Sequence, residues 1–222
     1  MPEAQPEELK RVYASRFDAR QDYRLRVWRV LIERFFQALV PENSTVLDLG
    51  CGYGEFINTV KARQKFGMDL NPRTQELLRP GVKFLRQDCS KPWSVGAGEL
   101  DVVFTSNFFE HLPDKSALGE TLAQAFRALR PGGRLIAMGP NIKFTHGRYW
   151  DFWDHYLPLT ELSLSEGLTV RGFVVEKCYP RFLPYTMVGA REYPPWCVGI
   201  YLGLPWLWRW KGEQFLIVAK KP

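Results

Sequence analysis

One stretch, from Thr45 to Phe56, limits what this chain can fold into more than any other part of it. The stretch reads T-V-L-D-L-G-C-G-Y-G-E-F: apolar and β-branched residues lead into three glycines at alternate positions, and a helical pattern follows. Glycines at this spacing let the backbone take positive φ and approach a ligand closely, because no Cβ intervenes. The following helix directs its amino-terminal N–H groups at the same place. The pattern predicts a strand, a tight turn and a helix over 55–63 around a bound ligand.

The acid before the glycines narrows the class of ligand. Asp48 stands two residues before Gly50, and Gly52 and Gly54 complete a G-x-G-x-G spacing, which differs from the G-x-G-x-x-G of dinucleotide sites. A carboxylate at this point repels a pyrophosphate and attracts a cationic amine. We therefore expect a ligand that carries a positive charge.

Polar residues also follow three later apolar runs. Strands are expected at 65–69, 82–87, 99–105 and 134–138, with helical patterns between them, which is typical of βαβ units and a parallel sheet. Ligands of such sheets bind outside the carboxyl ends of the strands. Asp69 lies 19 residues beyond Gly50. This is close to the interval at which α/β nucleotide sites place an acid that binds the ribose hydroxyls. The other expected strand ends carry Asp88 and Ser106-Asn107.

Residues from about Thr45 to Met138 resemble the class I S-adenosylmethionine (SAM) methyltransferases of the UbiE-like, or type 11, group. The resemblance is carried by V-L-D-L-G-C-G-Y-G, G-M-D-L-N, R-Q-D-C, L-D-V-V-F-T-S-N-F-F-E-H-L-P-D and A-L-R-P-G-G-R-L. It implies an α/β fold: a Rossmann-like, seven-stranded, mostly parallel sheet with helices on both faces and an antiparallel last strand. In that fold, segments 173–177 and 214–219 form the antiparallel closing pair. The motifs are specific for the family and unspecific for the substrate.

The resemblance also implies that SAM is the cofactor, with S-adenosyl-L-homocysteine as its product, and it suggests roles for individual residues. Asp48 and the glycines would line the methionine half, Asp69 would take the ribose diol, and Leu70 would pack on the adenine. Asp88 would accept from the adenine amine, Cys89 would offer its backbone, and Asn107 would face the methyl donor. The predicted cofactor-binding set is Asp48, Gly50, Cys51, Gly52, Gly54, Asp69, Leu70, Asp88, Cys89 and Asn107.

We expect one methyltransferase domain over residues 1–222. Its predicted parts are an N-terminal helical lid (1–40), with an amphipathic helix over 22–39, and a SAM-binding core (41–138). An acceptor-side loop, a closing strand and an aromatic insertion follow (139–213), and then the last strand (214–222). The insertion contains W-C-V-G-I-Y-L-G-L-P-W-L-W-R-W at 196–210, which is too short and too interrupted to span a bilayer. It suits peripheral contact with a membrane or a greasy substrate, but a lid packed on the domain or an oligomer contact is the favoured interpretation.

The segment after the fifth expected strand is long and rich in aromatic and polar residues, as an acceptor pocket would require. The predicted acceptor-binding residues are Phe108, His111, Asn141, Tyr149, Trp150, Trp153 and His155. His111 and His155 are the candidates for a catalytic base, although His111 is equally suited to holding its loop. A metal site can be imagined from Glu110-His111, His146 and Asp154-His155, but no H-E-x-x-H or comparable spacing supports it, and no metal is expected.

Composition bears mainly on location and partners. The four cysteines form no C-x-x-C pair, so a reducing cytoplasm is expected. The amino terminus lacks the basic start and apolar run of a signal peptide. Within the cytoplasm, peripheral contact with the inner membrane face is the expected location for a membrane-bound fraction. The net charge of +6 favours anionic partners, but no run of like charges marks a nucleic-acid tail, and the sequence argues against nucleic acid. The leading hypothesis is methyl transfer to a small or lipid-linked acceptor, at oxygen. The alternatives are an RNA or protein methyltransferase, or a SAM-binding protein without turnover.

Overall fold

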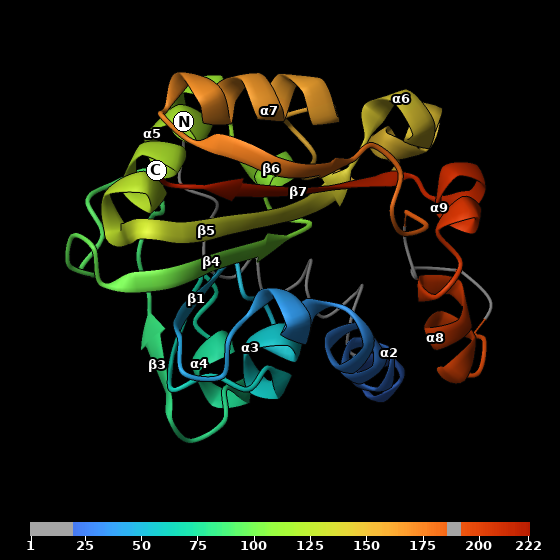
Figure 1. Cartoon of the computed structure of the whole chain (residues 1–222), viewed down its shortest axis with the longest axis horizontal. Helices are drawn as coiled ribbons and strands as arrows, with labels where there is room; N and C mark the ends of the chain where they lie inside the picture. The colour runs from blue at the N-terminus through green and yellow to red at the C-terminus, as the bar shows by residue number, and fades with distance from the viewer. Residues whose placement is uncertain (1–19, 186–191) are drawn as a thin grey trace.

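The computed structural model describes residues 20–185 and 192–222, and its centre is one seven-stranded sheet (Figure 1). The strand order is β3-β2-β1-β4-β5-β7-β6, and β7 alone runs antiparallel to its two neighbours. This is the Rossmann-like methyltransferase sheet that the sequence predicted. The strands are β1 (Thr45–Leu49), β2 (Gln64–Met68), β3 (Val82–Leu85), β4 (Leu100–Ser106), β5 (Leu129–Pro140), β6 (Val174–Tyr179) and β7 (Gln214–Lys220).

Helices cover both faces of the sheet (Figure 1). The α-helices are α2 (Gln21–Arg34), α3 (Glu55–Thr59), α4 (Thr74–Leu77), α5 (Lys115–Ala128), α6 (Ile142–Thr145), α7 (Glu161–Val170), α8 (Trp196–Leu202) and α9 (Pro205–Lys211). The described residues also contain the 3₁₀ turns η2 (Phe36–Leu39), η3 (Phe109–His111) and η4 (His146–Asp151). Side chains cap the starts of two helices, since Asp114 accepts from the Ala117 N–H at the start of α5 and Thr160 forms a capping box at the start of α7.

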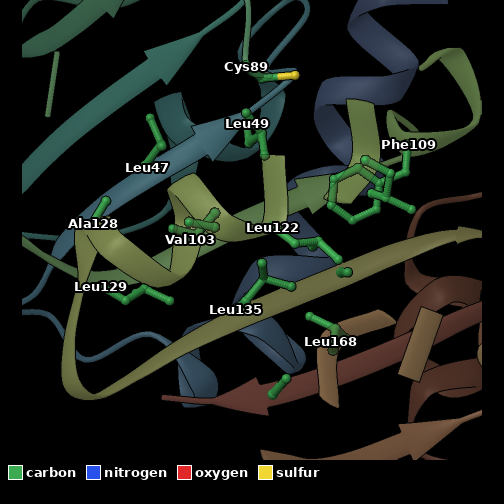
Figure 2. Packing of buried hydrophobic residues seen from close by; sticks show 14 of the residues in the cluster. Leu47, Leu49, Cys89, Val103, Phe109, Leu122, Ala128, Leu129, Leu135 and Leu168 are labelled. Carbon is green, nitrogen blue, oxygen red and sulfur yellow. The ribbon is translucent and has the colours of Figure 1, made fainter. Parts of the chain in front are cut away.

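Alternation along the strands gives the sheet two apolar faces. On β1, Leu47 and Leu49 belong to the core beneath α5 and α7, whereas Val46 belongs to the core beneath α2 and α3. Figure 2 shows the first core, in which Leu122 of α5 and Leu168 of α7 lie over strand residues. Because both faces are covered, the central strands are apolar nearly throughout, and polar function is confined to the strand ends.

Two predicted helices end earlier than expected, for identifiable reasons. The helix expected over 22–39 stops at Arg34, because Phe35 leaves the helical conformation and its ring packs against Phe182 and Trp208, with centroids 4.8 and 5.8 Å away. The helix expected over 55–63 stops at Thr59, where the Lys65 ammonium donates to the carbonyls of Ile57 and Val60 at 3.0 and 3.2 Å. Tertiary contacts outweigh the helical pattern in both cases.

The aromatic segment at 196–210 folds into two short helices, α8 and α9. Leu202 and Trp208 are buried against the core beneath α2, while Trp196, Ile200, Trp206 and Trp210 are 54–66% exposed. None of the helices in the described ranges is long and apolar enough to cross a membrane.

Candidate active site

The glycine turn lies between β1 and α3. Gly50, Gly52 and Gly54 all have positive φ, at 69°, 51° and 76°, which side chains with a Cβ rarely adopt. The N–H groups of Gly50 and Cys51 donate to the carbonyl of Met68 at 2.9 and 3.1 Å, so the turn is tied to the end of β2. The predicted tight turn is therefore present, and it lies at the carboxyl edge of the sheet.

Asp69 connects this turn to the next strand end. Its two carboxylate oxygens accept hydrogen bonds from the N–H groups of Gly52 and Asn71, each at 2.8 Å. Burial raises the pKa of this carboxyl, and the backbone donors partly oppose the rise. Each oxygen keeps a second lone pair, so the carboxylate is positioned to accept further hydrogen bonds from a ligand diol.

Asp48 is buried beneath the turn. Burial and the nearby charge of Glu55 raise its pKa well above the usual range, and a hydrogen bond from the Ile57 N–H opposes them. Glu55 in turn forms an ion pair with Arg24 of α2 at 2.7 Å. The N-terminal helix therefore reaches the acids of the glycine turn. A cation bound here would be favoured by this excess of buried carboxylates.

The other predicted cofactor residues surround the same edge. Leu70 is 50% exposed directly after Asp69. Asp88 is exposed and accepts from the N–H and hydroxyl of Ser90, whereas Cys89 is buried with its Sγ 3.3 Å from the Thr121 hydroxyl. Asn107 is exposed with φ of 50°, a conformation that asparagine tolerates better than most residues. These strand ends thus carry an exposed apolar side chain, that of Leu70, and two exposed polar ones, those of Asp88 and Asn107.

These features fit a ligand with SAM's groups. The positive-φ glycines leave the backbone bare, the buried acids favour an ammonium, and Asp69 suits a diol. The exposed Leu70 offers an apolar surface for a flat ring. Burial also raises the pKa of the Cys51 thiol, so this side chain is a neutral packing group rather than a nucleophile.

A second group of polar residues lies beyond β4. Glu110, His111 and His155 each offer a ligand atom, and these atoms all lie within 4.8 Å of one another. The two histidine rings meet edge to face, with centroids 4.9 Å apart. Burial raises the pKa of Glu110 to about 8, and the charge of Asp154 adds to that effect. The structure thus brings together His111 and His155, the two histidines that the sequence singled out.

The orientation of the histidines comes from the segment between η4 and α7. His111 Nδ1 lies 2.9 Å from the carbonyl of Asp154 and 3.3 Å from its carboxylate, while His155 Nδ1 lies 3.0 Å from the carbonyl of Tyr149. Asp154 therefore orients His111 rather than His155, its neighbour in sequence. The Tyr185 hydroxyl lies 3.3 Å from His155 Nδ1. The predicted set contained neither Glu110, Asp154 nor Tyr185.

The remaining predicted acceptor residues have differing surroundings. Tyr149 is fully buried, and its ring packs 4.8 Å from that of His155. Asn141 is also fully buried, and its amide donates to Glu161 and to the Pro180 carbonyl at 2.6 and 2.9 Å, so it anchors α6 to α7. Trp150 and Trp153 are 58% and 81% exposed. His146 is exposed and is not one of the three clustered donors.

Phe108 joins the two groups of residues. Its ring packs against Gly50, such that a Cβ built at Gly50 would lie 2.2 Å from Phe108 Cδ2. Glu110 and His111 of the second cluster stand two and three residues after Phe108. A ligand that reaches the glycine turn therefore comes close to the residues expected to contact an acceptor.

Comparisons of the sequence agree with this geometry. A family model described as a methyltransferase domain matches residues 19–177. A probable S-adenosylmethionine-dependent methyltransferase of Mycolicibacterium smegmatis is 30% identical over 165 residues, which cover 71% of this chain and 62% of that protein. The 2-methyl-6-phytyl-1,4-hydroquinone methyltransferase of a Synechocystis species is 31% identical over 124 residues, which cover 52% of this chain and 38% of that protein. The chain thus spans less than two thirds of either relative's length.

Among solved structures, one similar chain belongs to a complex from Haloferax volcanii between the Trm112 methyltransferase activator and a methyltransferase. The two folds superpose with a TM-score of 0.72 over 98% of this chain and 97% of the other, at 20% sequence identity. At that identity the likeness concerns the fold alone.

Proposed function

This chain belongs to the class I SAM-dependent methyltransferases, and from that premise we propose that it methylates an oxygen atom of a small or lipid-linked acceptor. The observation that carries the proposal is the cluster of Glu110, His111 and His155, which follows closely in the chain on Phe108, whose ring packs against Gly50. A hydroxyl acceptor has to lose its proton during methylation, and an imidazole cluster is suited to assist that loss.

The donor side would be held by the residues at the first two strand ends. SAM supplies an electrophilic methyl group on a sulfonium. We propose that Asp69 accepts from the ribose hydroxyls, that the buried acids around Asp48 attract the ammonium, and that Leu70 packs on the adenine. The bare backbone at Gly50 and Gly52 would allow the close approach that these contacts need.

On the acceptor side, His111 and His155 would act on the hydroxyl. Methylation breaks the donor's C–S bond, forms a C–O bond and releases the hydroxyl proton. The acceptor oxygen must therefore lie in line with the S–CH₃ bond. It must also lie close to a group that removes its proton or stabilises the resulting oxyanion. The Nδ1 atoms of both rings lie at hydrogen-bond distance from backbone carbonyls, which can only accept. The basic lone pair of each neutral ring is therefore on Nε2. Phe108 and Trp150 would provide apolar walls.

A lipid-linked acceptor is favoured by the surface of α8 and α9. Trp196, Trp206 and Trp210 are exposed on these helices, with Arg209 and Lys211 in the last turn of α9. Exposed Arg26 and Arg29 lie on α2, which packs against α8. Tryptophan beside basic residues suits the interface of an anionic membrane. The name of the Synechocystis relative gives its acceptor as a hydroquinone with a phytyl chain, which is of the same general kind.

Two measurements test the proposal. Isothermal titration of the full chain with SAM and S-adenosylhomocysteine should show one site each, and Asp69→Ala should weaken SAM binding at least tenfold. Undiminished binding by Asp69→Ala would remove the proposed donor site. Tritium transfer from methyl-labelled SAM in a fractionated cell extract should place label in the organic phase. Label in RNA or protein alone would favour the alternative acceptors instead.

A further inference from the structure

Glu110, His111 and His155 form a donor set that the methyl donor does not use. One carboxylate oxygen and one nitrogen from each ring lie within 4.8 Å of one another. Ligand atoms around a single tetrahedral zinc ion stand about 3.3 Å apart, given metal–ligand distances near 2.0–2.1 Å. Small side-chain adjustments would therefore close the three donors around one ion.

The second observation is the direction in which the imidazoles are fixed. Each Nδ1 lies 2.9–3.0 Å from a backbone carbonyl, that of Asp154 for His111 and that of Tyr149 for His155. Because a carbonyl only accepts, Nδ1 carries the proton and Nε2 carries the lone pair. Histidines that bind metals show this same arrangement, with the far ring N–H donated to a carbonyl or carboxylate. Two neighbouring histidines that only pack in a core do not both need an Nδ1–H that donates to a backbone carbonyl.

Backbone hydrogen bonds hold η3, which contains Glu110 and His111, against the segment that contains His155. The carbonyl of Glu110 accepts from the N–H groups of Tyr156 and Leu157 at 2.8 and 3.1 Å, which fixes the segment containing His155 against η3. Glu110 and His155 are 4% and 7% exposed, whereas the His111 side chain is 29% exposed. Two of the three donor residues are therefore buried, and His111 is the one of the three that is partly exposed to solvent.

A buried hydroxyl next to the cluster also points to a missing partner. Tyr149 is fully buried, its ring lies 4.8 Å from that of His155, and its hydroxyl has no hydrogen-bond partner among the described residues. A buried hydroxyl without a partner costs free energy, and a water or oxygen ligand held at the neighbouring cluster would satisfy it.

We infer that Glu110, His111 and His155 bind one divalent first-row transition metal ion, such as Zn²⁺ or Co²⁺, through the carboxylate and the two Nε2 atoms. Two imidazoles and one carboxylate suit these ions better than Mg²⁺, which prefers oxygen ligands. Three protein donors leave a coordination position open, as in catalytic zinc sites.

The role of this ion rests on the proposed function. An acceptor hydroxyl at the open position would be oriented by the metal, and its pKa would fall, so that the proton passes to solvent before the C–O bond forms. With the ion bound, the two Nε2 lone pairs are engaged by the metal, so the imidazoles would assist the loss of the proton by holding the ion rather than by accepting the proton themselves. Metal binding itself does not depend on the identity of the acceptor.

The test uses full-length protein freed of metal with a chelator. Calorimetric titration with Zn²⁺ should give one site per chain, and Co²⁺ should produce visible d–d absorption that Zn²⁺ abolishes. Glu110→Gln and His111→Gln should each weaken Zn²⁺ binding at least tenfold, whereas His146→Gln, at an exposed histidine outside the cluster, should leave it unchanged. His111→Gln is decisive, because its partly exposed ring can be replaced without opening the core.

SAM titration of the same preparations separates the two hypotheses. Wild-type protein that binds SAM but neither metal would overturn the metal site and leave the proposed function standing. Unchanged Zn²⁺ affinity in His111→Gln would overturn it as well. If metal binds as expected while SAM does not, the proposed donor site fails and the metal site stands.

Discussion

The ring of Phe108 packs directly against the backbone of Gly50, leaving no room for a side chain at that glycine. A Cβ there would lie 2.2 Å from Phe108 Cδ2, and the backbone has φ of 69°. We expect Gly50→Ala to destabilise the protein by ~1–3 kcal/mol and to abolish SAM binding, because both the turn and Phe108 must move. Gly81→Ala is the matched control, since Gly81 also has positive φ but has nothing within 4 Å of an added Cβ. It should cost ~1–2 kcal/mol and leave the SAM affinity intact. Thermal melts and calorimetry measure both effects.

Asp69 provides a test of the diol-binding role that preserves the shape of the side chain. In Asp69→Asn one of the two N–H donors, from Gly52 or Asn71, faces an amide NH₂ instead of an oxygen. We expect the dissociation constant for SAM to rise at least tenfold. Asp101→Asn is the control, because Asp101 is another largely buried aspartate that accepts a backbone N–H, that of Thr45, at the opposite end of β1. The prediction is wrong if both variants bind SAM equally well.

Burial of Asp48 should make stability depend on pH. The pKa of its carboxyl is raised in the folded state, so the folded protein binds this proton more tightly than the unfolded chain, and stability decreases as pH rises from the unfolded pKa toward the folded one. Asp48→Asn removes that loss while retaining an oxygen for the Ile57 N–H. We expect Asp48→Asn to have a higher melting temperature than the wild type at pH 8, where that loss of stability is present.

The same substitution should change stability less at pH 5, because the wild-type carboxyl is then closer to neutral. We also expect weaker SAM binding, since a buried negative charge is lost. Melts at the two pH values, compared with wild type, decide the point. An equal change in melting temperature at both pH values would contradict the assigned cause.

The ion pair between Arg24 and Glu55 should couple the N-terminal helix to the glycine turn. The two side chains are 17% and 6% exposed, so removing one partner leaves a buried charge. Arg24→Met should reduce the free energy of unfolding by about 3 kcal/mol, whereas the double variant with Glu55→Met should recover much of that loss. Denaturant unfolding of the two single variants and the double variant forms the cycle. Additive losses would show that the pair carries no coupling.

The aromatic surface of α8 and α9 should bind anionic bilayers. We expect the protein to float with phosphatidylglycerol-containing vesicles at low salt, and Trp206→Ala with Trp210→Ala to reduce the bound fraction several-fold. Trp153→Ala is the matched control, because Trp153 is 81% exposed but lies outside these helices. Protein that remains at the bottom with every lipid, and sediments as a dimer, would identify the surface as an oligomer contact.

The donor half of the site was predictable from the sequence because its geometry is local. Asp48 is the next-to-last residue of β1 and Asp69 directly follows β2, and parallel strands bring their carboxyl ends to one edge. The seven-stranded, mostly parallel sheet and its antiparallel last strand followed from the resemblance and are confirmed.

The acceptor half was less accessible because its contacts depend on the path of a long connection. Asp154 stands beside His155 in the sequence, yet its carboxylate faces His111, since the backbone of this segment is held by the carbonyl of Glu110. Glu110 itself was visible only as the residue before His111. The breaks at Phe35 and Thr59 likewise come from tertiary contacts that no periodicity encodes.

The pairing of Pro140 with Gln214, where β5 meets β7, gives the chain a modular character. The segment between these residues leaves the sheet and returns to it at neighbouring positions, and it contains β6, the outermost strand. Such a segment can be exchanged between relatives without altering the strands that carry Asp48 and Asp69. A change of acceptor could therefore arise in evolution by replacing one continuous piece of the gene, while the chemistry of the donor is inherited unchanged.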